Sequence, residues 1–206
     1  MGTFDVRVQL KELYTPPTAD FVEVVVPPVT TLAVVGRGDP NTGGEYGPAV
    51  EALFTVGYAL KFAGKKALGE DMAVGPLEAL WRAADMSAFT AHRTSDWEWT
   101  ALIPVPDRVA AAALADAVAA AAAKGRGGPS LDRVRVVRMD EGRCVQIMHL
   151  GPYSAEGPTL ARLHEVYLPA HGLVPTGDHH EIYLSDARRT APDRLRTILR
   201  QPVGPA

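Results

Sequence analysis

An internal repeat is the feature of this sequence that most limits its fold. Residues 47–56 and 157–166 share one pattern, in which a Gly-Pro pair is followed by apolar residues at every third position. Proline fits the first turn of a helix, and apolar residues at this spacing lie on one helix face. Each Gly-Pro pair therefore predicts an amphipathic helix, the first ending at Gly64, and the recurrence indicates a duplicated fold.

Segments rich in β-forming residues flank both predicted helices. In chain order they are residues 21–26, 31–35, 72–81, 97–105, 134–139, 144–150, 180–184 and 197–200. The first two segments are predicted to fold back on each other at Pro27-Pro28. We expect one α+β domain of two ββαββ-type halves, approximately 20–105 and 132–203, related by a pseudo-twofold axis with a ligand cleft between them.

An alanine-rich tract, residues 109–123, joins the two halves. Alanine is the best helix former, and Asp107 is a suitable N-cap. We therefore expect a helix over residues 107–124, with Leu114 and Val118 on a narrow apolar stripe. Its many small side chains predict close packing against another element.

Composition excludes several classes of protein. The 206 residues are 47% hydrophobic and 22% charged, which favours a globular chain over a disordered one. A formal charge of -3 argues against binding to nucleic acid. The single Cys144 allows no internal disulfide, and the first residues lack the pattern of a secretion signal. We expect a cytoplasmic protein that does not enter the membrane.

The sharpest candidate for chemistry is Glu181, which lies in an otherwise apolar segment. Strand alternation places His179, Glu181 and Tyr183 on one face. Burial raises the pKa of a carboxyl group and neighbouring donors lower it, so this trio could supply a general base or bind a cationic ligand. The alternative is an ordinary strand glutamate that faces water or pairs with an arginine.

Glu78 occupies the corresponding place in the first half if residues 77–81 are aligned with residues 180–184. Under that alignment Glu78 and Glu181 would face each other across one apolar cleft. Two carboxyl groups in such a cleft can take different protonation states and divide the acid and base roles. A purely structural role for Glu78 remains open.

Tryptophans supply a possible aromatic wall. Trp97 and Trp99 share a strand face, so their indoles could hold a flat ligand or stack on a cation, with Trp81 as a third member. The alternative is that they belong to the core. His179 and His180 point to opposite faces and cannot chelate one ion together. We predict no metal and no cofactor, and an inert thiol at Cys144.

Taken together, several segments resemble the GyrI-like small-molecule-binding family, whose fold is a duplicated βαββ unit. The segments that carry the resemblance are residues 36–41, 76–81, 146–153, 179–186, 188–192 and 199–203. The resemblance implies that Glu181 is the acidic residue of the family's ligand cleft. It implies pocket-lining positions for Glu78, Trp81, Trp97, Trp99, Tyr153 and Tyr183, and we add Met148 and His179 as predicted ligand contacts.

Within that family the chain is similar to a stand-alone branch that includes cyclopropanoid cyclopropyl hydrolases, which protect cells from DNA-alkylating natural products. The resemblance implies a flat, mostly apolar ligand and addition of water to a strained cyclopropane, with catalysis by Glu181, Glu78 and Tyr183. The alternatives are a non-catalytic protein that binds or sequesters drugs and a module that interacts with gyrase. The segment before Phe21 is too short for a DNA-binding helix-turn-helix, which disfavours promoter regulation.

Overall fold

The strands of the protein form one antiparallel sheet. The computed structural model describes residues 3–42, 44–83 and 96–206. The strands are β1 (Val22–Val26), β2 (Val29–Arg37), β3 (Leu77–Ala83), β4 (Trp97–Pro104), β5 (Arg135–Met139), β6 (Gly142–Leu150), β7 (Leu173–Pro175), β8 (His179–Tyr183) and β9 (Arg196–Pro205). Their order across the sheet is β1-β6-β9-β8-β3-β4-β2-β5, and β7 pairs with the end of β9.

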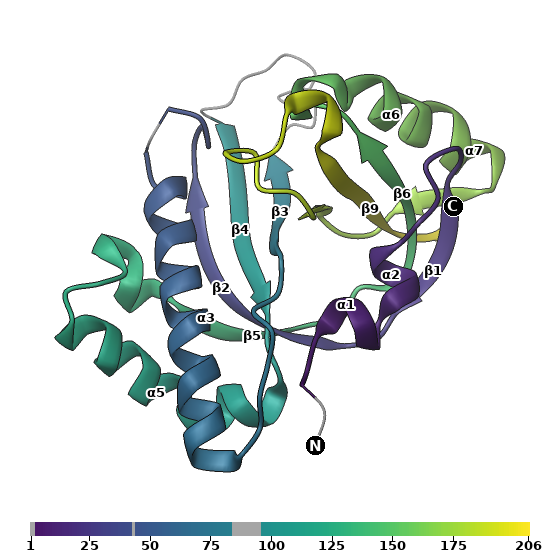
Figure 1. The fold of residues 1–206 in the computed structure, drawn as a ribbon. Helices are drawn as coiled ribbons and strands as arrows, with labels where there is room; N and C mark the ends of the chain where they lie inside the picture. Colours follow the sequence, from purple (N-terminus) through teal and green to yellow (C-terminus); the bar gives the residue numbers. More distant parts are fainter. Residues whose placement is uncertain (1–2, 43, 84–95) are drawn as a thin grey trace.

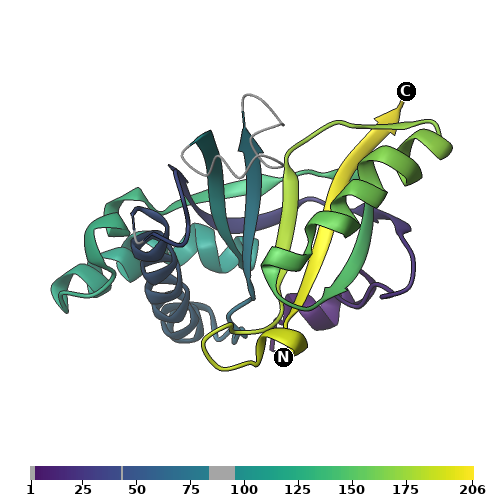
Figure 2. The same cartoon turned by 90° about the horizontal axis from the view of Figure 1, so that it is seen from above.

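Two groups of helices lie on one face of this sheet, and a third group lies on the opposite face. They are α1 (Val6–Gln9), α2 (Lys11–Tyr14), α3 (Tyr46–Leu68), α5 (Asp107–Ala123), α6 (Gly157–Ala161) and α7 (Leu168–Ala170). A π-helical turn, Arg162–Tyr167, connects α6 to α7. In Figure 1, α3 and α5 lie on the left of the molecule and α6 and α7 on the upper right, with the central strands between them. Figure 2 shows the same separation from above.

The strand order confirms the duplication. Exchanging β1 with β5, β2 with β6, β3 with β8 and β4 with β9 turns the observed order into its own reverse. The pseudo-twofold axis therefore passes between β3 and β8, the two strands at the centre. The predicted α+β class with two repeated halves is correct.

The predicted hairpin at Pro27-Pro28 is wrong. β1 pairs with β6, whereas β2 pairs with β4 and β5. The chain thus crosses from one half of the sheet to the other at this point, and it crosses back between β5 and β6. Each half contributes one strand that pairs with a strand of the other half. The residues at a turn therefore do not predict which strands pair.

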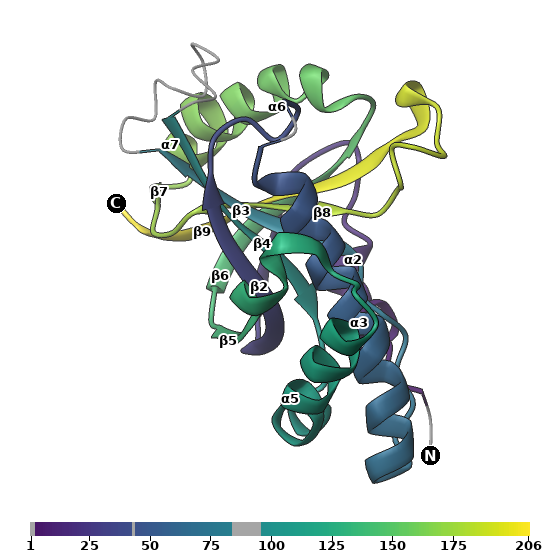
Figure 3. The same ribbon diagram turned by 90° about the vertical axis from the view of Figure 1, so that its left-hand side faces the viewer.

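The two long helices pack closely, as Figure 3 shows for α3 and α5. α3 continues past Gly64 and ends at Gly69, which takes a left-handed conformation with φ of 67°. Gly64 is a contact point, since a Cβ there would lie 2.7 Å from Cγ1 of Val109. The N-cap of α5 is Pro106, and Asp107 is its first residue.

The close packing predicted for α5 is confirmed, but its buried stripe differs from the predicted one. The buried residues are Val109, Ala110, Ala113, Ala117 and Ala121. Leu114 and Val118 are only partly buried at the edge of the contact. The alanine side carries the contact because small side chains let the two helix backbones approach.

Register divides the sheet into two faces, because paired residues of neighbouring strands point the same way. On one face, called the helix-covered face below, α3 and α5 pack on residues such as Val34 and Ala101, and the helical segment 157–170 packs on Ile147 and Leu199. The N-terminal face is covered by α1 and α2, which pack against Ile182 and other strand residues. Within the described residues, no helix has the length and apolar character needed to span a bilayer.

Candidate functional site

Glu181 lies at the centre of the sheet, on the helix-covered face. The hydroxyl of Tyr183 donates a hydrogen bond of 2.7 Å to its Oε2 atom. Nε1 of Trp81, on the adjacent strand β3, donates to the Tyr183 oxygen at 3.0 Å. β8 contributes the acid and the tyrosine two positions apart, and the pairing with β3 brings in the indole. Trp81, Tyr183 and Glu181 thus form a hydrogen-bonded chain in which Trp81 donates to Tyr183 and Tyr183 donates to the Glu181 carboxylate.

Aromatic rings surround this chain. Tyr46 stacks on Trp81 with centroids 5.7 Å apart, and Trp97 meets Trp81 edge-on at 5.6 Å. On the other side, Tyr153 meets Tyr183 edge-on at 5.5 Å. Glu181, Tyr183, Trp81, Trp97, Tyr46 and Tyr153 are called the Glu181 cluster below.

The Glu181 cluster is partly open to solvent. Tyr153 is 40% exposed, and the Glu181 side chain is 15% exposed. Burial raises the pKa of Glu181 to about 7, while the hydrogen bond from Tyr183 and the charge of His180 behind the sheet oppose this rise. A carboxyl group that titrates near neutrality is suited to general base catalysis.

His179 is placed beside Glu181, as predicted. Its Nε2 atom lies 3.8 Å from Oε1 of Glu181. Burial lowers the pKa of His179 to about 3, so the ring is neutral. Neither of its ring nitrogens has a hydrogen-bond partner among the described residues.

Glu78 does not face Glu181. Glu78 pairs with Ile182, whereas Glu181 pairs with Ala79, so the two carboxyl groups point to opposite faces of the sheet. The alignment of residues 77–81 with residues 180–184 was off by one position, and a shift of one residue moves every side chain to the other face. The prediction that both acids line one cleft is therefore wrong.

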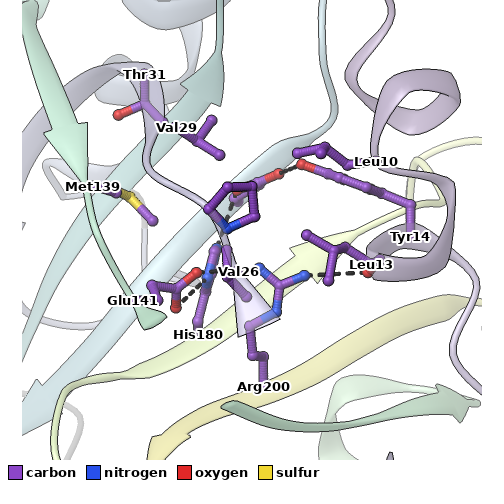
Figure 4. Close-up of a pocket in the computed structure, with 12 residues that line it drawn as sticks. Leu10, Leu13, Tyr14, Val26, Val29, Thr31, Met139, Glu141, His180 and Arg200 are labelled. Atoms are coloured by element: carbon purple, nitrogen blue, oxygen red, sulfur yellow. Dashed lines mark hydrogen bonds and ion pairs between the residues drawn. The ribbon is translucent and has the colours of Figure 1, made fainter. Parts of the chain in front are cut away.

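Glu78 instead joins a buried network on the N-terminal face. It accepts a hydrogen bond of 2.7 Å from the Tyr14 hydroxyl, and its other oxygen lies 3.1 Å from Nε2 of His180. Nδ1 of His180 lies 3.0 Å from Glu141, whose second oxygen accepts from Arg200 at 3.1 Å. Figure 4 shows four of these side chains converging. Tyr14, Glu78, Glu141, His180 and Arg200 are called the His180 network.

The His180 network is electrically balanced. The neighbouring carboxylates raise the pKa of His180 to about 9 despite its burial, so the ring is an imidazolium that donates to both acids. His180 and Arg200 hold the pKa of Glu141 down at about 2. The cavity beside these groups measures about 10 Å³, roughly the space of one water molecule. These features fit a structural anchor better than a ligand site.

Two predicted ligand contacts are core residues. Trp99 is 1% exposed and packs in the core beneath Tyr46, with ring centroids 5.0 Å apart. Met148 lies on the N-terminal face, because it pairs with Ile198 in register. Both positions follow from register, which the sequence pattern alone did not fix.

Three residues near the site were not predicted from the sequence, namely Tyr46, Glu156 and Thr197. Tyr46 and Glu156 each come directly before one of the repeated Gly-Pro pairs, so the repeat contained a usable indication of both. Thr197 is paired with Tyr183 and shares its face. Burial and repulsion from Glu181 raise the pKa of Glu156 to about 9.

Other candidate groups have no evident chemical role. Within residues 3–42, 44–83 and 96–206, no set of three or more histidine, cysteine or acidic side chains is placed to hold a metal ion. Cys144 is buried and unpaired, and burial raises the pKa of its thiol to about 12.

The fold and the site define a small-molecule-binding protein, with an acidic group and aromatic side chains where two repeated halves meet. Residues 20–203 match the model of the GyrI-like small molecule binding domain. The chain therefore belongs to the GyrI-like family.

Solved structures from Listeria innocua are similar to the whole chain. An uncharacterized conserved protein is 35% identical, with a TM-score of 0.85, and the match covers 98% of this chain and 100% of that one. Two hydrolase structures are each 34% identical with the same coverage and have TM-scores of 0.81 and 0.83. No curated protein matches the chain.

Proposed function

We propose that this protein is a cytoplasmic hydrolase that opens the cyclopropane ring of flat, mostly apolar cyclopropanoid compounds and so protects the cell from DNA alkylation. The observation that carries the proposal is the hydrogen bond of Tyr183 to Glu181 inside an aromatic cluster. The similarity to two hydrolases supports the catalytic part. The ring system is inferred from the family resemblance.

Each part of the Glu181 cluster has a task in the proposed reaction. The indoles of Trp81 and Trp97 provide flat apolar surfaces against which a planar ligand can stack. Tyr183 fixes one carboxylate oxygen of Glu181 and leaves the other to orient and deprotonate a water molecule. Opening of the strained ring restores an aromatic phenol, which supplies much of the driving force.

Turnover separates this proposal from binding alone. The experiment incubates a catalytic amount of protein with a cyclopropanoid of the duocarmycin kind and follows the water adduct by mass spectrometry. The expected result is product in large excess over protein. Product that never exceeds the amount of protein, together with tight binding, would establish sequestration instead.

The first mutational prediction concerns Glu181→Gln. The amide keeps the shape of the side chain but cannot accept the proton of water, so turnover should fall by at least about a hundredfold while ligand binding is largely kept. Binding is measured by quenching of tryptophan fluorescence. Glu98→Gln, which changes an exposed glutamate on β4, is the matched control and should behave as the wild type. Unchanged turnover in Glu181→Gln would remove Glu181 from the mechanism.

A further inference from the structure

A second acidic side chain, Glu156, is buried beside the Glu181 cluster. The residue is 5% exposed and precedes α6. Its backbone N–H donates to the carbonyl of Tyr153 at 3.1 Å, which closes a short turn. Because the Tyr153 ring contacts Tyr183, this turn lies over the end of β8 next to the Tyr183–Glu181 hydrogen bond.

Oε1 of Glu156 has no hydrogen-bond partner within the described part of the chain. A hydrogen bond from the Thr197 side chain opposes the rise in the pKa of the Glu156 carboxyl group. Thr197 is fully buried and lies opposite Tyr183 in the β8–β9 register. Buried polar atoms are nearly always hydrogen-bonded, so the unpaired Oε1 of Glu156 indicates where a polar group of a ligand is received.

The two acids differ in what surrounds them. Glu181 accepts a short hydrogen bond from Tyr183 and has the imidazolium of His180 behind it. Burial and the charge of Glu181 act together on Glu156 and raise its pKa further. When two such groups share a site, the better-stabilised one ionises first, and the other keeps its proton. Glu181 is thus the anion and Glu156 the neutral acid.

We propose that Glu156 is the acid partner of Glu181, donating a hydrogen bond and then a proton to the carbonyl oxygen of the ligand. The inference rests on the proposed hydrolase function and adds a catalytic residue to it. It also supplies the second carboxyl group that the sequence pattern predicted at Glu78, which lies on the other face of the sheet.

The proposed step balances. The water molecule gives one proton to Glu181, and its oxygen forms a bond to the cyclopropane CH₂ carbon. The ring C–C bond breaks, and its electron pair enters the dienone, which becomes a phenol as Glu156 gives its proton to the carbonyl oxygen. The ligand has gained one water molecule. Solvent then carries a proton from Glu181 to Glu156 and restores the starting state.

Other titratable groups surround the pair. They are Tyr46 of α3, His149 of β6, Tyr153, His164 of the π-helical turn, and His179 and Tyr183 of β8, with His180 and Glu141 behind the sheet. Burial raises the pKa of the three tyrosines and lowers that of His164 and His179. His180 has a pKa of about 9, close to that of Glu156, so the test must distinguish these two groups.

The kinetic test uses Glu156→Gln, which keeps a hydrogen-bond donor but has no proton to transfer. In the wild type, kcat/KM should rise as Glu181 ionises near pH 7 and fall as Glu156 ionises near pH 9. In Glu156→Gln, kcat should drop by about a hundredfold with KM within about threefold, and the fall at high pH should disappear. This variant retains His180. If its kcat equals that of the wild type and its kcat/KM still falls near pH 9, the fall does not come from Glu156 and the proposal is overturned. Glu165→Gln, an exposed change on the π-helical turn, is the matched control.

A second test needs no turnover. The titration of glutamate carboxyl carbons is followed by NMR in ¹³C-labelled protein, with Glu156→Gln and Glu181→Gln assigning the two resonances. Removal of Glu181 should lower the apparent pKa of Glu156, because the repulsion from the ionised Glu181 is lost. An unchanged Glu156 titration in Glu181→Gln would overturn the acid pair. If the wild-type protein shows coupled titration but no turnover, the acid pair is confirmed and only the hydrolase function is rejected.

Discussion

At the scale of single residues, two tryptophans on one strand face have different surroundings. Trp97 is partly buried against Trp81, whereas Trp99 is almost fully enclosed. Gly36 of β2 lies opposite Trp99 and its lack of a side chain makes room for the indole, whereas Gly38, which follows in register beside Trp97, has no atom within 4 Å of an added Cβ. The sequence pattern placed both residues on the same face correctly, but it contained no information about this fit.

The second prediction follows from that difference. Trp97→Ala should weaken binding of a flat ligand by about 1 to 3 kcal/mol, because it removes an exposed part of the aromatic surface. Trp99→Ala should lower the free energy of unfolding by about 3 to 5 kcal/mol and leave the affinity of the folded protein nearly unchanged. Urea unfolding and fluorescence titration measure the two effects. If Trp99→Ala instead weakens ligand binding and Trp97→Ala lowers the free energy of unfolding, Trp99 belongs to the site.

At the scale of elements, the helices were easier to predict than their contacts. The Gly-Pro pairs located the start of α6 to within one residue and the start of α3 to within two. The end of α3 was misplaced because Gly64 can be a contact residue as well as a terminator, and only the neighbouring α5 shows which it is. The strand register was also mispredicted, since the aligned residues 77–81 and 180–184 carry apolar side chains on both faces.

The third prediction tests the contact between α3 and α5. Gly64→Ala adds about 1 kcal/mol of helix propensity, yet its Cβ would lie 2.7 Å from Val109, and overpacking costs about 1 to 3 kcal/mol. We expect a net loss of stability in urea unfolding. Gly47→Ala, in the exposed first turn of the same helix, has no atom within 4 Å of the added Cβ and should not destabilise.

A double variant shows whether the loss comes from this contact. Val109→Ala removes the atoms that the new methyl group meets, so Gly64→Ala should cost less in that background than in the wild type. Equal costs in the two backgrounds would mean that the α3–α5 distance is not set by this pair.

At the scale of the whole molecule, the duplication was readable from sequence and the strand exchange was not. A repeat shows that two halves share a pattern, but the pairing of β1 with β6 and of β2 with β5 depends on distant residues. The acid Glu181 and its partner Tyr183 were found because they share a strand. Glu156 was missed because it lies on a turn before α6, far from β8 in the sequence.

The His180 network links distant parts of the chain into one body. Arg200 of β9 donates to the carbonyl of Leu13 in α2 at 3.1 Å, and Tyr14 of α2 donates to Glu78 of β3. The N-terminal helices are therefore fastened to the centre of the sheet by charged groups. Breaking a buried ion pair by removing one partner typically costs about 3 to 5 kcal/mol.

The last prediction concerns the pH dependence of this anchor. The folded-state pKa of His180 is raised from 6.5 to about 9, so its contribution to stability is fully present below about pH 6.5 and is lost as the pH rises through 9. This loss is on the order of 3 kcal/mol. The contribution of Glu141 to stability depends on pH in the opposite direction. Its lowered pKa gives stability above pH 4.5 that is lost as the pH falls towards 2. The contribution of this network, measured as the difference in unfolding free energy between the wild type and His180→Gln in urea at a series of pH values, should therefore be greatest between about pH 5 and 6.5.

NMR titration of the imidazole ring and His180→Gln assign the alkaline loss. The His180 ring should keep its proton to about pH 9, and His180→Gln should be less stable than the wild type by about 3 to 5 kcal/mol at pH 6, because it leaves two buried carboxylates without their cation. His171→Gln, at an exposed histidine, is the control and should change stability by less than about 1 kcal/mol. A His180 ring that titrates near pH 6.5 would show that the carboxylates of Glu78 and Glu141 do not hold an imidazolium between them, and the N-terminal helices would then be held by apolar packing alone.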